Sequence, residues 1–231
     1  MKKLPILTAV LLLVACTSAP PTPEWQSQSL SAIKSYKAAY LSGNTRVAEV
    51  EFERAKTEVA RTGRPDLMAR LELLRCATQV ASLVMNPCTG YQALAQDAAP
   101  AEHAYASFIA GRWAALQAEQ LPMHYRTLVT QTQAQASQNA KAEPDTVAPI
   151  QSKLNQIEDP LARLVAAGAL IRREPLSTAD IELAVETASA QGWRRPLLAW
   201  LGVQLKRDQT IGNAETAAGI QRRIDLVLLK N

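Results

Sequence analysis

A helical hydrophobic period runs along almost the whole chain and constrains its fold more than any other feature. Apolar residues recur at intervals of three or four, and no alternating pattern of useful length competes with them. The clearest sets are Leu30, Ile33, Tyr36 and Tyr40; Ala48, Phe52, Ala55 and Val59; Leu67, Leu71 and Leu74; and Tyr105, Phe108, Ile109 and Leu116. The sequence therefore predicts an all-α protein.

Prolines divide this pattern into separate helices. Each precedes an apolar-periodic run, where the missing N–H costs nothing and the fixed φ angle suits the first helical turn. These prolines are Pro65, Pro100, Pro122, Pro160 and Pro196. Asn44, Asp159, and Ser177 with Asp180 three residues later are typical N-cap signals. We therefore expect helices to begin near these positions.

The first sixteen residues have the layout of an export signal. Lys2 and Lys3 precede an apolar run that is too short, at ~1.5 Å per residue, to cross a bilayer core of ~30 Å. The run ends in Leu13-Val14-Ala15-Cys16, which resembles the lipobox of bacterial lipoproteins. The resemblance implies cleavage before Cys16 and acylation of this cysteine. An ordinary secretory signal and a short buried helix are the alternatives.

The lipobox resemblance also implies a location. Thr17 stands where such families carry an aspartate for retention in the inner membrane, so we expect anchoring in the outer membrane, facing the periplasm.

The segment 131–145 lacks an apolar stripe and indicates either a helix extension or a linker. The expected regions are a signal peptide (1–15), a tether (16–24), an N-terminal helical region (25–143) and a C-terminal helical-hairpin region (144–231).

Charge and motif content argue against several classes of function. The chain has 25 basic and 21 acidic side chains, and loss of Lys2 and Lys3 with the signal would lower the formal charge from +4 to +2. This balance does not favour nucleic-acid binding. The sequence has no Gly-x-Ser-x-Gly, no phosphate-binding glycine loop, no His-Glu-x-x-His, and no Glu-Ser pair of the kind that helical transglycosylases use. No catalytic residue, cofactor or metal is therefore expected.

Two cysteines remain after Cys16, twelve positions apart. In an oxidising periplasm we expect Cys76 and Cys88 to form a disulfide, worth ~3 kcal/mol for a loop of this size. Metal ligation and redox activity are the less favoured alternatives because the spacing suits neither. A straight helix from Pro65 to Met85 would carry its end so far from Cys76 that Cys88 could barely return to bonding range, so the helix should end or bend before Met85.

The histidines and two of the tryptophans are assigned structural roles. His103 and His124 each follow a proline near the start of a predicted helix, which suggests surface or capping roles. A shared metal or acid–base site would require the two helix starts to lie side by side. Trp113 and Trp200 are predicted to lie in the core because of their apolar neighbours.

The C-terminal half contains an internal repeat of 34 residues. Aligning Gly168 with Gly202 pairs Leu164 with Leu198, and thirty-four is the tetratricopeptide period. The residues that resemble positions of that family are Leu201, Gly202, Leu205 and Ala214, and upstream Gly43, Ala48, Phe52 and Ala55. The resemblance implies stacked helical hairpins in a tetratricopeptide-like α-solenoid, although the family's first-helix aromatic is missing. A compact helical bundle is the alternative.

Stacked helical hairpins offer an extended surface that suits peptides and protein segments. We therefore predict a lipid-anchored periplasmic scaffold or adaptor, held by outer-membrane lipid through the acyl chains of Cys16. It would bind an unidentified envelope protein in envelope assembly, secretion or cell-wall maintenance. A carboxylate-dependent envelope hydrolase is one alternative, and it should have an acidic cleft with a carboxyl kept protonated by burial. An envelope ligand-binding module is another.

Dibasic pairs in the C-terminal half are the candidate partner-binding residues. The candidates are Arg172, Arg173, Arg194, Arg195, Lys206 and Arg207. The first and third pairs coincide under the 34-residue offset, so in stacked hairpins they should lie on successive turns of one edge and form a cationic ridge. The alternative is that these residues only stabilise helix C-termini, with Glu174 and Asp208 neutralising their field.

Overall fold

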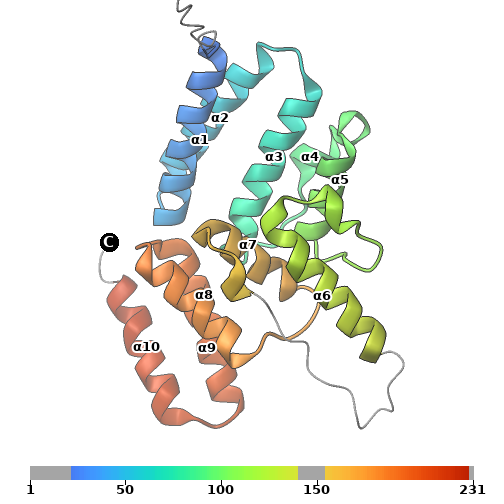
Figure 1. Ribbon diagram of the computed structural model, residues 1–231. Coiled ribbons are helices and arrows are strands. Elements are labelled where there is room, and N and C mark those ends of the chain that lie inside the picture. Colours follow the sequence, from blue (N-terminus) through green and yellow to red (C-terminus); the bar gives the residue numbers. More distant parts are fainter. Residues whose placement is uncertain (1–21, 140–153, 229–231) are drawn as a thin grey trace, which may run out of the picture.

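The chain folds into helices that pack as adjacent pairs (Figure 1). The computed structural model describes residues 22–139 and 154–228, and these residues include no strand. The α-helices are α1 (Glu24–Ser42), α2 (Thr45–Ala60), α3 (Pro65–Val80), α4 (Thr89–Gln92), α5 (Pro100–Ile109), α6 (Met123–Asn139), α7 (Pro160–Leu170), α8 (Thr178–Ala190), α9 (Arg194–Thr210) and α10 (Ala214–Leu228). The predicted all-α class with stacked helical hairpins is confirmed.

Proline and cap residues start several helices where the sequence predicts. Pro65, Pro100 and Pro160 are the first residues of α3, α5 and α7. Three N-cap side chains accept a hydrogen bond from the backbone N–H three residues later, which satisfies a donor that the helix leaves free. These N-cap residues are Asn44, Asp159 and Ser177.

Two apolar clusters hold the helices together. The smaller one joins α1, α2 and one side of α3 around Tyr36 and Phe52, whose ring centroids are 5.3 Å apart. The larger one draws residues from α3 and from α5 to α10, and it buries Trp113 and Trp200 completely, as predicted. This core contains residues from both sides of the region boundary that the sequence places at 143/144, and the boundary itself lies outside the described residues.

The C-terminal end of α3 joins the first and second halves of the chain. Gly168 of α7 lies so close to Val80 that an added Cβ would collide with the backbone carbonyl oxygen of Val80. Trp200 of α9 donates a hydrogen bond from Nε1 to the carbonyl oxygen of Ala81, at 3.1 Å. The two C-terminal hairpins therefore contact the same end of α3 through a close backbone approach and a buried hydrogen bond.

The disulfide and the helix end that it requires are both confirmed. Helix α3 ends at Val80, which is before Met85. The chain then turns back, and the Cα atoms of Cys76 and Cys88 lie 5.8 Å apart in a disulfide. The cross-link ties α3 to the segment that leads into α4.

The 34-residue repeat corresponds to two consecutive hairpins, α7–α8 and α9–α10. Helix α7 begins at Pro160, and helix α9 begins 34 positions later, at Arg194. Helix α7 ends at Leu170, whereas α9 continues to Thr210. The first helices of the two hairpins therefore start at equivalent positions of the repeat but end at different ones. Residues 131–139 extend helix α6, which is the first of the two alternatives that the sequence leaves open for the segment 131–145.

The predicted anchor cannot be located in the fold. The signal peptide, Cys16 and the tether as far as residue 21 lie outside the described residues. Among residues 22–139 and 154–228, no helix combines the length and the apolar character needed to cross a bilayer.

Candidate ligand-binding site

A cavity of about 520 Å³ lies where α3, α5, α6 and α7 meet. This volume is within the range of small-ligand and peptide side-chain sites, roughly 300–1,000 Å³. Much of its lining is apolar and comes from buried or half-buried side chains. The apolar lining includes Leu73, Leu74, Ala77, Leu121, Leu161, Ala162 and Val165.

Helix α7 supplies one wall because of how it begins. The Asp159 side chain caps the helix by accepting from the N–H of Ala162 at 2.7 Å, and Pro160 fixes the first turn. Leu161 and Val165 are four residues apart, so they lie on one face of the helix. The cap and the spacing together turn Leu161, Ala162 and Val165 toward the cavity.

Polar side chains also line the cavity, and Thr78, Glu102 and Tyr125 among them are buried. Opposite charges balance in the lining, because two basic and two acidic side chains line the cavity and leave no net formal charge while the histidine is neutral. The polar lining residues are Lys37, Arg70, Thr78, Tyr105, Glu102, Gln120, His124, Tyr125 and Asp159. The lining thus combines hydrogen-bond donors and acceptors with apolar side chains.

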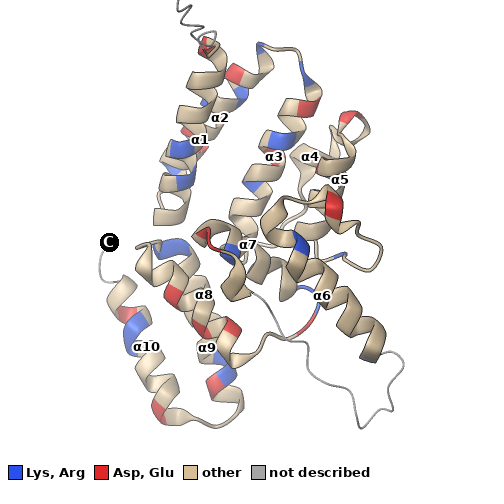
Figure 2. Cartoon of the chain, in the orientation of Figure 1, with Lys and Arg blue, Asp and Glu red and all other residues tan. Residues whose placement is uncertain are grey.

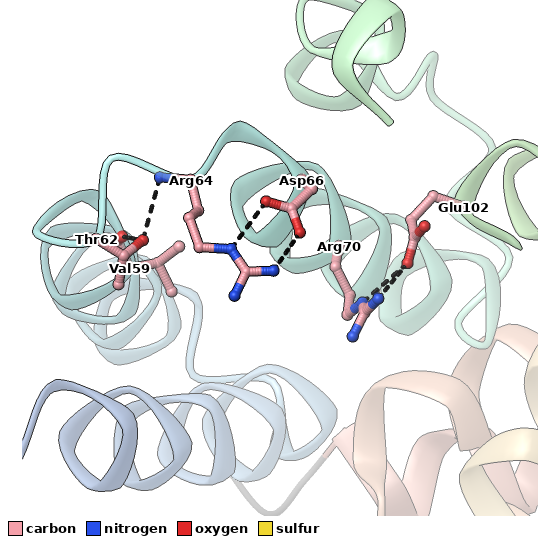
Figure 3. Close-up of polar contacts among 6 residues, drawn as sticks. All are labelled: Val59, Thr62, Arg64, Asp66, Arg70 and Glu102. Carbon is pink, nitrogen blue, oxygen red and sulfur yellow. Dashed lines mark hydrogen bonds and ion pairs between the residues drawn. The ribbon is translucent and has the colours of Figure 1, made fainter. Parts of the chain in front are cut away.

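Glu102 joins α5 to α3 through Arg70 (Figure 3). Its Oε1 accepts hydrogen bonds from Arg70 Nε at 2.9 Å and Nη2 at 2.7 Å. Glu102 is only 6% exposed, whereas the Arg70 side chain is 66% exposed. The second carboxylate oxygen, Oε2, is buried and accepts no hydrogen bond from the described part of the chain. Glu102 lines the cavity, but this oxygen has almost no accessible surface, so it lies beneath the lining.

The start of α3 is fixed by a second group of polar contacts, also drawn in Figure 3. Thr62 Oγ1 donates to the carbonyl oxygen of Val59 at 2.6 Å and accepts from the N–H of Arg64 at 3.2 Å. Arg64 donates to Asp66 from Nε at 3.2 Å and from Nη2 at 2.7 Å, and this hydrogen bonding lowers the pKa of Asp66. These contacts set the direction of the helix one turn before Arg70.

Two tyrosines form an aromatic wall between α5 and α6. The rings of Tyr105 and Tyr125 have centroids 6.0 Å apart and an interplanar angle of 30°. Burial raises the pKa of Tyr105 to about 12, and it raises the pKa of Tyr125 well above its usual value. Both hydroxyls therefore stay protonated at neutral pH, where they serve as hydrogen-bond groups without adding charge.

The two histidines lie at different cavities. His124 lines the candidate site, where desolvation lowers its pKa and the nearby Asp159 carboxylate opposes that shift. His103 borders a second cavity of about 820 Å³, and its Nδ1 is 2.9 Å from the hydroxyl of Tyr91. The described residues contain no group of three His, Cys, Asp or Glu side chains that could hold a metal ion.

The pair Arg194 and Arg195 lies at the start of α9, and Arg195 contacts the first hairpin of the chain. Arg195 Nε donates to the carbonyl oxygen of Tyr40 at 2.7 Å, and Nη2 donates to Thr45 Oγ1 at 2.7 Å. The guanidinium also lies 4.3 Å from the centroid of the Tyr40 ring. Arg195 thus braces α9 against the α1–α2 turn.

The other two candidate pairs lie in different local structures. Arg172 and Arg173 are in the turn after α7, where the Arg173 guanidinium lies 5.2 Å from the centroid of the Trp113 ring. Lys206 and Arg207 are still helical, in the last turns of α9. Figure 2 shows acidic segments along α8 and both basic and acidic segments along α9 and α10. A cationic ridge across these pairs stays a prediction.

Sequence reasoning did not identify the cavity. Its lining comes from α1, α3, α5, α6, α7 and their connections, so no local spacing marks it. The one local signal is Pro100-Ala101-Glu102, which the sequence indicates only as a helix start. Arg70 and Glu102 are 32 residues apart and carry no mutual pattern.

Comparison with known proteins gives no functional assignment. No family model, curated protein or solved structure matches the chain. What the protein binds is therefore inferred from the chemistry of its own cavity.

Proposed function

We propose that the protein is a lipid-anchored periplasmic adaptor that holds an envelope protein partner through the cavity between α3, α5, α6 and α7. The observation that carries this proposal is the cavity itself, about 520 Å³ in volume, whose lining combines apolar side chains with polar ones of balanced charge. Binding sites typically combine a concave apolar surface with a few polar groups that set orientation.

The anchor in this proposal is Cys16. It rests on the resemblance of Leu13-Val14-Ala15-Cys16 to a lipobox and on Thr17 after the cysteine. The Cys76–Cys88 disulfide supports an oxidising compartment, since such bonds persist mainly outside the cytosol. A protein held in the outer membrane by lipid would present its helical body to partners in the periplasm.

Binding is favoured over catalysis because the cavity carboxylates already have structural partners. Glu102 is bound by Arg70, and Asp159 caps α7. Burial raises the pKa of Glu174, but this carboxyl lies in the turn after α7 and outside the cavity lining. A general acid for the hydrolase alternative would need a protonated carboxyl at the site of reaction. We therefore favour the adaptor over the envelope hydrolase.

Site-specific photo-crosslinking in cells tests the binding part of the proposal. Ala101 and Ala179 are both exposed second residues of a helix, but only Ala101 lines the cavity. A benzoylphenylalanine at position 101 of the full chain should give a discrete crosslinked species after irradiation, and one at position 179 should not. Equal products at both positions, or none at either, would contradict binding at the cavity.

Fatty-acid labelling tests the anchor separately. Cys16→Ser should abolish incorporation of labelled palmitate and leave the precursor uncleaved. A protein that matures at another site and carries no lipid would show that the anchor is wrong, while leaving the cavity to be tested on its own.

A further inference from the structure

We infer that Arg112, Arg172 and Arg173 form a second binding site, where the ends of α5 and α7 meet, and that this site takes the phosphate group of a small phosphate monoester. The three arginines border two cavities, of about 820 Å³ and about 290 Å³. None of them lines the cavity of the proposed function, so the inference does not depend on that proposal.

A close contact between two helix ends brings the three arginines together. Gly111, two residues beyond the end of α5, has a φ of +74°, and an added Cβ there would lie 3.0 Å from Cβ of Arg172 and 3.4 Å from Cγ of Arg173. Arg112 is therefore next to the turn that carries the other two arginines. It shares the larger cavity with Arg173 and the smaller one with Arg172.

The positive charge at this place is not balanced. Among the described residues that line the two cavities, none is acidic. Arg112, Arg172 and Arg173 form no ion pair with the described part of the chain. Glu174 follows Arg173 in the turn and interacts with it electrostatically. Even with Glu174 ionised, three positive charges oppose one negative charge, and two positive charges stay uncompensated.

The guanidinium groups are open to a ligand. Arg112 and Arg172 are exposed, and the one side-chain contact of Arg172 is a weak hydrogen bond from Nη1 to Met85 Sδ at 3.5 Å. Arg173 is half-buried over the Trp113 ring, and only its Nε is buried without a hydrogen-bond partner. Its Nη1 and Nη2, which also lack a hydrogen bond within the described residues, therefore keep accessible surface.

Two uncompensated positive charges match a phosphate monoester better than other common anions. Near neutral pH such a group carries a charge of about −1.5 to −2 and presents three acceptor oxygens. Arginine binds these oxygens through two parallel N–H donors, so several arginines can share one phosphate. A carboxylate or a sulfate ester carries a single negative charge and would leave one positive charge unbalanced.

The larger cavity has room for the organic part of the ester. Its volume of about 820 Å³ is far more than a phosphate group needs and lies within the range of small-molecule sites, roughly 300–1,000 Å³. Beside the arginines, its lining includes the neutral polar residues Ser107, Gln117 and Gln120 and the apolar residues Ala114, Ala115 and Leu116. These side chains suit an uncharged body attached to the phosphate.

Three probes of similar shape test the ligand class. Phenyl phosphate, phenyl sulfate and benzoate are titrated by calorimetry at pH 7.5 into the purified full chain in phosphatidylcholine nanodiscs. Phenyl phosphate should bind about ten-fold more tightly than the other two, because only it brings a second negative charge to the arginines. Benzoate that binds as tightly as phenyl phosphate would favour the carboxylates of an acidic protein and would overturn the inference.

Variants of the arginines locate the site. Arg112→Gln and Arg173→Gln should each weaken phenyl phosphate binding about ten-fold, since each removes charged hydrogen bonds. Arg112→Lys keeps the charge but loses the planar fork, so it should recover only part of the affinity. Lys206→Gln is the matched control. It removes an equally exposed positive charge in α9, on the ridge that the repeat predicts, and should bind as wild type does.

Each remaining outcome has a defined meaning. Equal weakening by Arg112→Gln and Lys206→Gln would assign the binding to overall charge and would overturn the site. No binding of phenyl phosphate at millimolar concentration would overturn it as well. If Arg173→Gln fails to fold, as judged by circular dichroism, the exposed Arg112 variants decide alone. Crosslinking at position 101 tests the proposed function separately, because no arginine of this site lines that cavity.

Discussion

The two C-terminal hairpins share a sequence repeat but differ in burial. Every residue from Leu164 to Leu170 of α7 is buried, whereas α9 buries only Pro196, Trp200, Leu201 and Asp208. The equivalent glycines show the same contrast, because Gly168 packs against the Val80 backbone and Gly202 has no atom within 4 Å of an added Cβ. The repeat thus sets local helix geometry, and position in the stack decides what each helix contacts.

The same contrast explains where the candidate site lies. Leu161 of α7 lines the cavity, while Arg195, 34 positions later, contacts the α1–α2 hairpin. Equivalent positions of the repeat therefore form a cavity wall in the first hairpin and a structural brace in the second.

The largest expected effect comes from Gly168→Ala. The new Cβ would meet the carbonyl oxygen and Cγ1 of Val80, and a backbone oxygen can yield only if α7 moves away from α3. We expect the free energy of unfolding to fall by about 3 kcal/mol. Urea denaturation followed by circular dichroism measures this, and a loss below ~0.5 kcal/mol would show that the close approach is not needed.

Arg195→Ala tests the brace of the second hairpin. It removes two hydrogen bonds to Tyr40 and Thr45 and the contact with the Tyr40 ring, so stability should fall by about 1–2 kcal/mol. Hydrogen exchange should rise most at the end of α1. Arg223→Ala, at an exposed position of α10, is the control and should stay within ~0.5 kcal/mol of wild type. Equal losses of stability in both variants would show that Arg195 does not brace α9 against the α1–α2 turn.

Gly202→Ala should have the opposite sign to Gly168→Ala. Position 202 is exposed within α9 and offers open space to a Cβ. Alanine has the higher helix propensity, so we expect a gain of about 0.5–1 kcal/mol. Thermal unfolding of the two glycine variants side by side measures the difference. Destabilisation at both positions would mean that the hairpins have equivalent surroundings.

The smallest expected effect is on the pH dependence of stability, through His124 of α6, which lines the cavity together with residues of α7. Desolvation lowers the pKa of His124 in the folded state, so the neutral ring contributes stability above its usual pKa of ~6.5, and this contribution is lost as pH falls through the lowered value. Wild type should therefore lose more stability than His124→Gln between pH 7 and pH 5. Identical pH profiles of unfolding would show that His124 is not desolvated.

Local signals made much of the fold predictable. Proline and N-cap residues act within one turn, so the starts of α3, α5 and α7 follow from the sequence alone. The disulfide and the end of α3 were predictable because chain geometry links a twelve-residue separation to a helix end. Burial was harder to assign. Leu30 continues an apolar period but is 56% exposed, because the period gives a face and not its partner.

The candidate site could not be predicted, since it depends on contacts between distant segments. The ion pair of Arg70 with Glu102 joins different helices, and Arg195 contacts Tyr40 across 155 positions. A dibasic pair gives no indication that one arginine is used inside the fold. Such contacts depend on how the hairpins stack, and the spacing of residue types does not encode this.

The central claim is that the partner segment enters the cavity beside α7 of the first hairpin and does not bind the equivalent region of the second. Methyl NMR of the full chain in nanodiscs, titrated with the blocked apolar tetrapeptide Ac-Leu-Ala-Leu-Ala-NH₂ as a probe, tests it directly. The account predicts shifts of the Leu73, Leu161 and Val165 methyl signals, with those of Val203 and Leu205 in α9 unchanged. Shifts at Val203 and Leu205 with none at Leu161 and Val165 would contradict it.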